Sequence, residues 1–293
     1  VTLCLSVVIA DVMEDIRSMI LANAKNIEMG IKIFEEEWDL ILAELEHSDF
    51  ALIEKQLIQT AKQLGSIPMK LSPKEVPTIS LVGEIFVRRD SLSRQYLTER
   101  LAEKGFATIC SPVAEWLKYS NYLVEKGLVD YTMSKMEKFD FLLKKRFMAK
   151  YEKHIKSILA SAGLVCPEPI DIKKIIKNAS PYISPNLVGE AILTIGSSFT
   201  EVATHTCGVI AIGPFGCMPN RLSEAILNES MDSGDRLSTE PKNKKLQAAL
   251  ANIEDLPFLA IESDGSPFPQ LINAKLEAFC LQAERLHERM LVV

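Results

Sequence analysis

The stretch that decides the fold is residues 208–220, with the sequence GVIAIGPFGCMPN. Its first five residues form a short apolar run, which is the pattern of a strand buried on both faces of a sheet. Gly213 and Gly216 permit a tight turn, and Pro219 suits the first turn of a helix that we expect to reach about residue 228. A strand that passes through such a turn into a helix is typical of a parallel α/β sheet.

Three further apolar runs, each followed by a helical pattern, repeat this arrangement at residues 78–87, 106–110 and 257–261. The helices that follow them are expected at about 90–104, from 112 onward, and at about 267–290. Strands that alternate with helices predict one parallel sheet of about four strands, in flavodoxin- or Rossmann-like layers flanked by helices. The polar stretch 229–246 is expected to be an exposed loop.

The segment before the first strand has a different character. Residues 11–65 carry apolar side chains at helical spacing and contain no proline, and residues 66–77 contain three prolines. The pattern predicts that residues 11–65 are helical and that a linker or loop follows. We therefore expect an N-terminal helical segment at 1–75 and an α/β domain at 76–293, with a long helical insertion at about 112–205.

Composition narrows the class of protein. The chain has 293 residues and a net charge of −6, which argues against nucleic-acid binding because phosphate contacts need a surplus of Lys and Arg. The apolar run at residues 1–10 is too short to span a bilayer and lacks the basic region of a signal peptide, so we expect no membrane association. None of the six cysteines forms a CxxC pair, which favours free thiols in the cytoplasm. Because the first residue is Val1, the chain could be a fragment of a longer protein.

In parallel α/β sheets, ligands bind beyond the carboxyl ends of the strands. This rule directs attention to the residues that follow each predicted strand, and we expect a cofactor or ligand to contact Gly83, Glu84, Arg88, Gly213, Pro214, Phe215 and Gly216. Glu84 and Arg88 share strand parity, so they could hold either each other or a polar ligand. Glu262 and Asp264 could bind a cation or form a solvated turn, of which the turn is the commoner case.

Cys217 is the most unusual residue at this edge. It lies between a strand end and a helix start, where unpaired N–H groups and the helix dipole stabilise a thiolate. A thiolate on a rigid loop suits metal or iron–sulfur ligation, whereas the alternative is a small buried apolar residue. Cys110 ends the second strand and could lie on the same edge as a second metal ligand. Cys207, Cys4 and Cys280 are expected to be structural.

The basic stretch 144–156 could contact a phosphate-bearing cofactor, although such a run is more often a solvated helix face. The sequence contains no P-loop and no GxGxxG, GxSxG or HExxH motif. Its four histidines are scattered, which argues against a metal site based on histidine.

Several segments, in this order along the chain, resemble a known family: 82–88 (VGEIFVR), 115–119 (EWLKY), 189–190 (GE), 214–219 (PFGCMP), 258–264 (FLAIESD) and 275–279 (KLEAF). They resemble the C-terminal region of acyl-CoA dehydratase activase-related proteins, which is similar to the iron–sulfur subunits of 2-hydroxyacyl-CoA dehydratases. The resemblance covers most of residues 76–293. It implies an anaerobe's cytoplasmic protein with a low-potential 4Fe–4S cluster and an ATP-dependent activator domain or subunit as partner. ATP use is not carried over, because the chain has no ATPase motif.

The chain departs from this family in its cysteines. Only Cys217 falls on a family motif, and Cys110 is placed by position alone. Thiolate-bound cubane clusters normally take four ligands, so a homodimer or a missing segment must supply the others, or there is no cluster.

Three hypotheses follow, and they leave open whether the protein is an enzyme. The first is a 2-hydroxyacyl-CoA dehydratase- or activase-like iron–sulfur protein in which Cys217 contacts the cluster. The second is a non-catalytic domain of a larger activase-type protein that binds a partner or an acyl-CoA at the same edge. The third is a flavodoxin-like domain that binds a small ligand and has no redox role.

Overall fold

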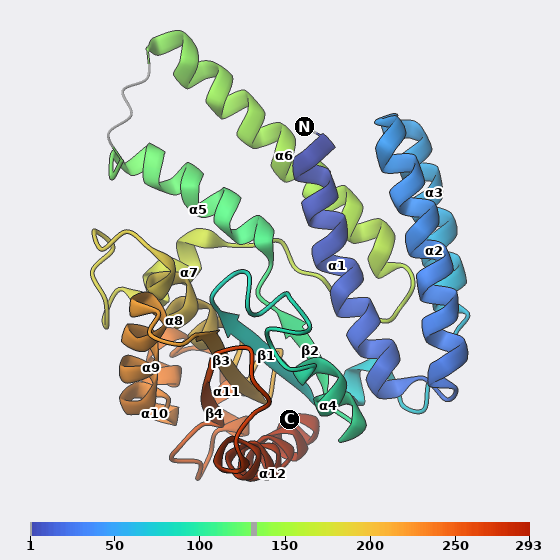
Figure 1. Cartoon of the computed structure of the whole chain (residues 1–293). Coiled ribbons are helices and arrows are strands. Elements are labelled where there is room, and N and C mark those ends of the chain that lie inside the picture. The colour runs from blue at the N-terminus through green and yellow to red at the C-terminus, as the bar shows by residue number, and fades with distance from the viewer. Residues whose placement is uncertain (1, 130–133) are drawn as a thin grey trace. The chain divides into compact units, whose positions relative to one another are not determined.

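The computed structural model describes residues 2–129 and 134–293 (Figure 1). The chain divides into two compact units, each built from two separate stretches of sequence. Unit 1 comprises Val1–Lys74 and Pro112–Ile170, and unit 2 comprises Glu75–Ser111 and Asp171–Val293.

Unit 2 contains the predicted sheet. Its strands are β1 (Thr78–Gly83), β2 (Ala107–Cys110), β3 (Gly208–Pro214) and β4 (Phe258–Ser263), all parallel and in the order β2-β1-β3-β4. The central strands β1 and β3 are almost wholly buried, as the apolar runs indicate. The predicted fold class, a four-stranded parallel sheet flanked by helices with a helical N-terminal segment, is confirmed.

Helices cover both faces of this sheet (Figure 1). On one face α8 (Glu190–Glu201) packs on β1 and on α9 (Met218–Ser230), which in turn packs on β3. On the other face α4 (Leu97–Glu103) packs on β2, and α12 (Gln270–Val292) packs on β4 and β3. The remaining helical elements are η1 (Pro73–Glu75), α7 (Ile172–Ala179), α10 (Ser233–Thr239) and α11 (Lys244–Ala249).

Two details of unit 2 differ from the sequence prediction. The polar stretch after α9 is not a loop but holds α10 and α11, because Asp232 and Asn243 cap them by accepting hydrogen bonds from the N–H groups of Asp235 and Leu246. The helix expected from residue 90 begins only at Leu97. Gln95 and Tyr96 adopt positive φ angles of 51° and 52°, which an α-helix does not permit.

Unit 1 is helical and consists of α1 (Thr2–Asn23), α2 (Ile27–His47), α3 (Phe50–Gly65), α5 (Val113–Lys126) and α6 (Lys135–Ala160). The helical segment predicted over 11–65 is divided between three helices, α1, α2 and α3. Asn26 and Asp49 start new helices by accepting hydrogen bonds from the N–H groups of Met29 and Ala51. Each of these side chains binds N–H groups of the residues that follow it, and this favours the start of a new helix over continuation of the preceding one. The apolar pattern is therefore divided between three helices.

The expected insertion at 112–205 is divided between the units. Residues 112–170 pack with the N-terminal helices, whereas α7 and α8 stay with the sheet. The physical reason is visible in α1, where the buried carboxylate of Asp11 accepts hydrogen bonds from the N–H groups of Val113 and Ala114, both at 2.9 Å. Asp11 thereby caps α5 from a distant point of the chain.

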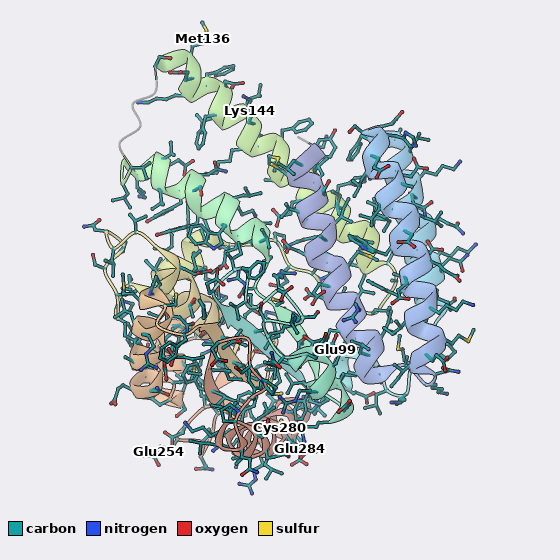
Figure 2. The ribbon with its side chains drawn as sticks, in the orientation of Figure 1. Glu99, Met136, Lys144, Glu254, Cys280 and Glu284 are labelled. Atoms are coloured by element: carbon teal, nitrogen blue, oxygen red, sulfur yellow. The ribbon has the colours of Figure 1, made fainter. Side chains whose placement is uncertain are left out.

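The helix α6 has two different halves. Its second half buries Ile155 and Leu159 beside α1 and α3. Its first half exposes Met136, Phe139 and Leu143, and Figure 2 shows Met136 near its start. Within the described residues, we find no helix whose length and apolarity would allow it to cross a membrane.

Candidate functional site

The site is built at the carboxyl edge of the sheet in unit 2, where four parallel strands end together (Figure 1). The chain moves from β1 outward to β2 and then returns to place β3 on the opposite side of β1. The gap between the ends of β1 and β3 is therefore the topological switch point, where ligands bind in open α/β sheets. The predicted residues after β1 and after β3 flank this point.

Three glycines shape the chain around the switch point. Gly83 has φ 108°, and a Cβ atom there would lie 2.1 Å from the carbonyl oxygen of Ile212 in β3. A Cβ atom at Gly213 would lie 2.6 Å from the side-chain amide carbon of Asn220. Gly216 adopts φ 73°, so the loop between β3 and α9 uses the left-handed turn that its sequence predicts.

Arg88 is the central charged residue of this edge. The residue is only 2% exposed. Its Nε donates to the carbonyl oxygen of Ser111 at 3.1 Å, and its Nη1 donates to the carbonyl oxygen of Gly83 and pairs with Glu190 Oε1 at 3.0 Å. Its Nη2 has no hydrogen-bond partner in the part of the chain that the structure describes. The guanidinium thus joins the ends of β1 and β2 to the start of α8 and keeps one buried nitrogen unused.

Strand parity suggested that Glu84 and Arg88 could hold each other or a polar ligand, but Glu84 binds backbone N–H groups instead. Its two carboxylate oxygens accept hydrogen bonds from the N–H groups of Phe86 and Val87, at 3.1 and 2.8 Å. Glu84 therefore closes the turn after β1, and Arg88 takes Glu190 as its ion-pair partner. The Gly189–Glu190 pair was noticed in the sequence only through the family resemblance, since β1 and α8 lie about one hundred residues apart along the chain.

Asn220 is a site residue that the sequence reasoning did not single out. It lies in the first turn of α9, is 3% exposed, and packs on Gly213. Neither Oδ1 nor Nδ2 of its amide finds a hydrogen-bond partner among the described residues. The sequence feature that could have identified Asn220 is its position at the end of the loop 213–220, in which Cys217 was singled out.

The loop itself exposes apolar side chains beside these polar groups. Phe215 and Met218 are 78% and 68% exposed, and Phe86 in the turn after β1 is 65% exposed. Pro214 ends β3, and its carbonyl oxygen accepts the N–H of Cys217 at 3.1 Å. The edge therefore offers exposed aromatic surface together with buried polar groups.

The strand β4 contributes a turn to this edge. Glu262 accepts a hydrogen bond from the N–H of Gly216 and pairs with Arg221 at 3.2 Å. Asp264 accepts the N–H of Ser266, and this hydrogen bond lowers the pKa of its carboxyl group. Both carboxylates thus bind groups of this chain, as expected for the solvated turn.

The structure does not bring Cys110 and Cys217 together. Cys110 ends β2, and Cys217 lies beyond the end of β3. Because β1 lies between β2 and β3, these two strands are on the order of 10 Å apart. The buried Sγ of Cys110 lies 3.5 Å from the carbonyl oxygen of Arg88, whereas Cys217 is partly exposed. No group of three or more His, Cys, Asp or Glu side chains within residues 2–129 and 134–293 could hold a metal ion. The described residues alone therefore do not form the ligand set of a cubane cluster.

Two other cysteines are buried as expected. Burial raises the pKa of the Cys207 thiol to about 12 and that of the Cys280 thiol, on α12, to about 11 (Figure 2). These thiols stay protonated at neutral pH, which suits structural residues.

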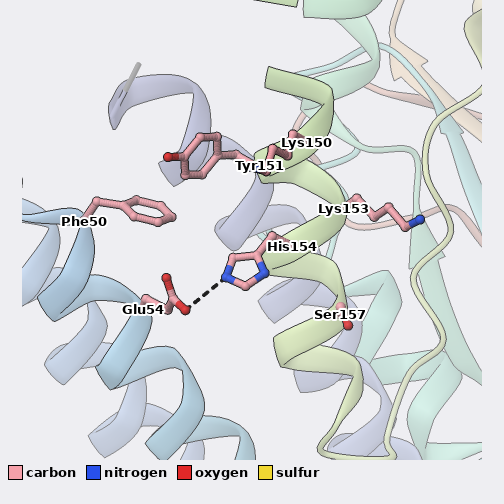
Figure 3. A pocket seen from close by; sticks show the side chains of 7 residues that line it. All are labelled: Phe50, Glu54, Lys150, Tyr151, Lys153, His154 and Ser157. Atoms are coloured by element: carbon pink, nitrogen blue, oxygen red, sulfur yellow. Dashed lines mark ion pairs between the residues drawn. The ribbon is translucent and has the colours of Figure 1, made fainter. Parts of the chain in front are cut away.

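Unit 1 carries a separate open pocket of about 480 Å³ between α3 and α6 (Figure 3). It lies on the basic helix of the sequence analysis and is lined by Phe50, Glu54, Lys150, Tyr151, Lys153, His154 and Ser157. His154 Nε2 lies 3.0 Å from Glu54 Oε1, and the rings of Phe50 and Tyr151 meet edge to face at 4.6 Å. These contacts join α3 and α6. Lys150 and Lys153 are exposed, as on a solvated helix face.

Comparison of the chain with protein-family models, with curated proteins and with solved structures gave no match. The resemblance to dehydratase activase-related proteins, the iron–sulfur cluster and the activator partner therefore stay predictions.

Proposed function

We propose that unit 2 is a binding domain for a small organic molecule, held at the carboxyl edge between β1 and β3, and that acyl-CoA is the class of ligand to test first. The observation that carries the proposal is the strand order, because it makes the gap between β1 and β3 the switch point. The loop predicted from the sequence as the functional centre, residues 213–220, borders that gap.

The side chains at this edge favour an amphipathic ligand. Phe86, Phe215 and Met218 expose apolar surface on the two loops that flank the switch point. Arg88 and Asn220 offer buried polar atoms that no described residue uses. An acyl thioester combines an apolar chain with polar groups, which agrees with the acyl-CoA class that the family resemblance implies.

The test is a calorimetric titration of the full chain, under anaerobic conditions, with acetyl-CoA, butyryl-CoA and free CoA. Phe215→Ser is expected to weaken binding of butyryl-CoA about ten- to a hundredfold, since burial of an aromatic side chain contributes roughly 1.5–3 kcal/mol. Phe139→Ser is the matched control, because Phe139 is a similarly exposed phenylalanine on α6 of unit 1. The proposal is wrong if no CoA compound binds, or if both substitutions weaken binding equally.

A second candidate function is supported by the position of Cys217, which is partly exposed and immediately precedes α9 at the same edge. There it could contribute one ligand to an iron–sulfur cluster whose other ligands come from a second copy or from another protein. Anaerobically reconstituted protein would then contain iron and sulfide, and Cys217→Ala would lose them. A preparation without iron after reconstitution would rule out this candidate and leave the binding domain untouched.

A further inference from the structure

The helices α8 and α9 both begin at the carboxyl edge, on the same face of the sheet, because each runs back across it from the ends of the strands. Ser223 Oγ of α9 lies 3.4 Å from the carbonyl oxygen of Ala191 in the first turn of α8, so the two helix starts are neighbours. Gly189 and Cys217 precede these helices, and no side-chain cap is found at either start in the described part of the chain. Two helix N-termini thus direct N–H groups toward one place.

A buried arginine lies beside the start of α8. Arg88 bonds to Glu190, the first residue of that helix, while its Nη2 stays without a partner within the described residues. A buried donor left without a partner costs about 1–3 kcal/mol, and more when it is charged. Native structures rarely leave such a group unused, so a ligand atom or an ordered water completes it.

A second buried group supports the same conclusion at the start of α9. The amide of Asn220 lies in the first turn of that helix against Gly213, and both of its polar atoms lack partners among the residues described. Arg88 and Asn220 come from different loops, and each is almost wholly buried. Their coincidence at neighbouring helix N-termini distinguishes this place from an ordinary helix end.

The charges at this place select the kind of anion. The charge of Arg88 is balanced by Glu190 at 3.0 Å. Each helix N-terminus contributes the equivalent of about +0.5 charge, so the pair contributes about +1. A monoanion matches that sum, whereas a dianion would bring an excess negative charge close to Glu190. Of the other carboxylates at the edge, Glu84 accepts backbone hydrogen bonds and Glu262 pairs with Arg221.

We propose that the first turns of α8 and α9, together with Arg88 and Asn220, form a site for a carboxylate monoanion. The statement that this carboxylate belongs to a larger ligand rests on the proposed binding function. The site itself is argued from the buried arginine and asparagine, which the strand order does not determine. Its chemistry predicts that the ligand carries a free carboxylate, which acetyl-CoA and butyryl-CoA lack, with the carboxylate oxygens facing Arg88 Nη2 and the N–H groups of the two helix starts.

The test uses the full chain labelled with ¹⁵N and follows the backbone resonances of Ala191 and Asn220 during titration with acetate or with inorganic phosphate at constant ionic strength. Acetate is expected to shift both resonances with saturation, and phosphate to do so more weakly. No saturable shift with acetate, or tighter binding of phosphate than of acetate, would overturn the proposal.

Three variants sharpen the result. Arg88→Lys keeps the charge beside Glu190 but removes Nη2, and we expect acetate binding to weaken about tenfold or more. Asn220→Asp has nearly the same shape but adds a negative charge, so it should abolish the acetate-induced shifts of both resonances. If Arg88→Lys fails to fold, the Asn220→Asp variant carries the test alone. Arg221→Gln changes an exposed arginine on the same helix and should bind acetate like the wild type. Equal effects of Arg221→Gln and Asn220→Asp would overturn the proposal.

Titration of the same samples with butyryl-CoA separates the two proposals. If butyryl-CoA binds and acetate shifts nothing, the carboxylate site is wrong and the binding function stands. If acetate saturates the site and no CoA compound binds, the carboxylate site stands and acyl-CoA is the wrong ligand class.

Discussion

Gly83 shows how much of the site depends on the absence of a single side chain. Its φ of 108° lies in the region that favours glycine, and a Cβ atom at this position would clash with the backbone of β3. The sequence alone marked Gly83 as a residue after a strand, but the close approach to Ile212 is known only from the register of the two strands.

Gly83→Ala is expected to destabilise unit 2 by about 3 kcal/mol or more, because the new Cβ would lie 2.1 Å from the carbonyl oxygen of Ile212 in addition to the backbone strain. Gly105→Ala is the matched control. Gly105 has φ 85° but no described atom within 4 Å of its Cβ position, so only backbone strain of roughly 1–2 kcal/mol is expected.

Urea unfolding followed by far-UV circular dichroism measures both variants. Tryptophan fluorescence is unsuitable for them, because Trp38 and Trp116 both lie in unit 1. Equal losses of stability for the two variants would contradict the close approach of Gly83 to β3.

Among the elements, α6 depends on a buried polar cluster centred on Glu152. This carboxylate pairs with Lys118 of α5 at 2.5 Å and with Lys156 at 3.1 Å, and it accepts the N–H of Ile170. Lys118 and Lys156 also donate to the carbonyl oxygens of Ile170 and Glu168. The cluster therefore joins α5, α6 and the segment after α6 within unit 1.

The stability of unit 1 should depend on pH through this carboxylate. Burial alone would raise the pKa of Glu152, but the hydrogen bond and charge of Lys118, together with Lys156, outweigh it and hold the pKa below its ordinary value of 4.5. A folded-state pKa that is lowered adds stability above the unfolded value, and this stability is lost as the pH falls through the folded value. Glu152→Gln should cost about 3 kcal/mol near neutral pH, because it leaves the buried Lys156 and the partly exposed Lys118 without their counter-charge.

Urea unfolding followed by tryptophan fluorescence measures this effect, since both tryptophans report on unit 1. The difference in stability between the wild type and Glu152→Gln should be constant near neutral pH and should shrink below about 4.5. A difference that stays constant into acid would show that Glu152 does not carry the effect.

At the scale of the whole molecule, the chain passes between the two units at three places, so unit 1 is discontinuous in sequence. The chain first passes from unit 1 to unit 2 after Lys74, but α5 and α6 belong to unit 1 and pack on α1 and α3. A fragment 75–293 would therefore retain the sheet while it exposes the apolar faces of α5 and α6.

We predict that fragment 75–293 binds a hydrophobic dye and that Trp116, its only tryptophan, emits at longer wavelength than in the full chain. A second fragment that also lacks 112–170, with a flexible linker between residues 111 and 171, should not bind the dye. Native emission of Trp116 without dye binding in the first fragment would show that α5 and α6 fold without α1–α3.

The sequence by itself determined the fold class, and it directed attention to the carboxyl edge of the sheet, where the candidate site lies. Short apolar runs followed by glycine and a helix specify buried parallel strands, and this local pattern was sufficient to identify all four strands and the loop at 213–220. Helix ends were less predictable at Asn26 and Asp49. Asn and Asp occur both at helix starts and within helices, so the residue type alone does not show where one helix ends and the next begins. The same holds for Asp232 and Asn243.

Only the tertiary structure decided which side chains share the site. The strand order separates Cys110 from Cys217, and it places the Glu190 end of α8 beside Arg88 across about one hundred residues. The packing of the loops and helices at this edge also leaves Arg88 and Asn220 buried with unused polar atoms. Periodicity and turn residues report on neighbours along the chain, whereas these contacts arise between segments distant in sequence, whose pairing depends on how whole faces of the sheet and helices pack.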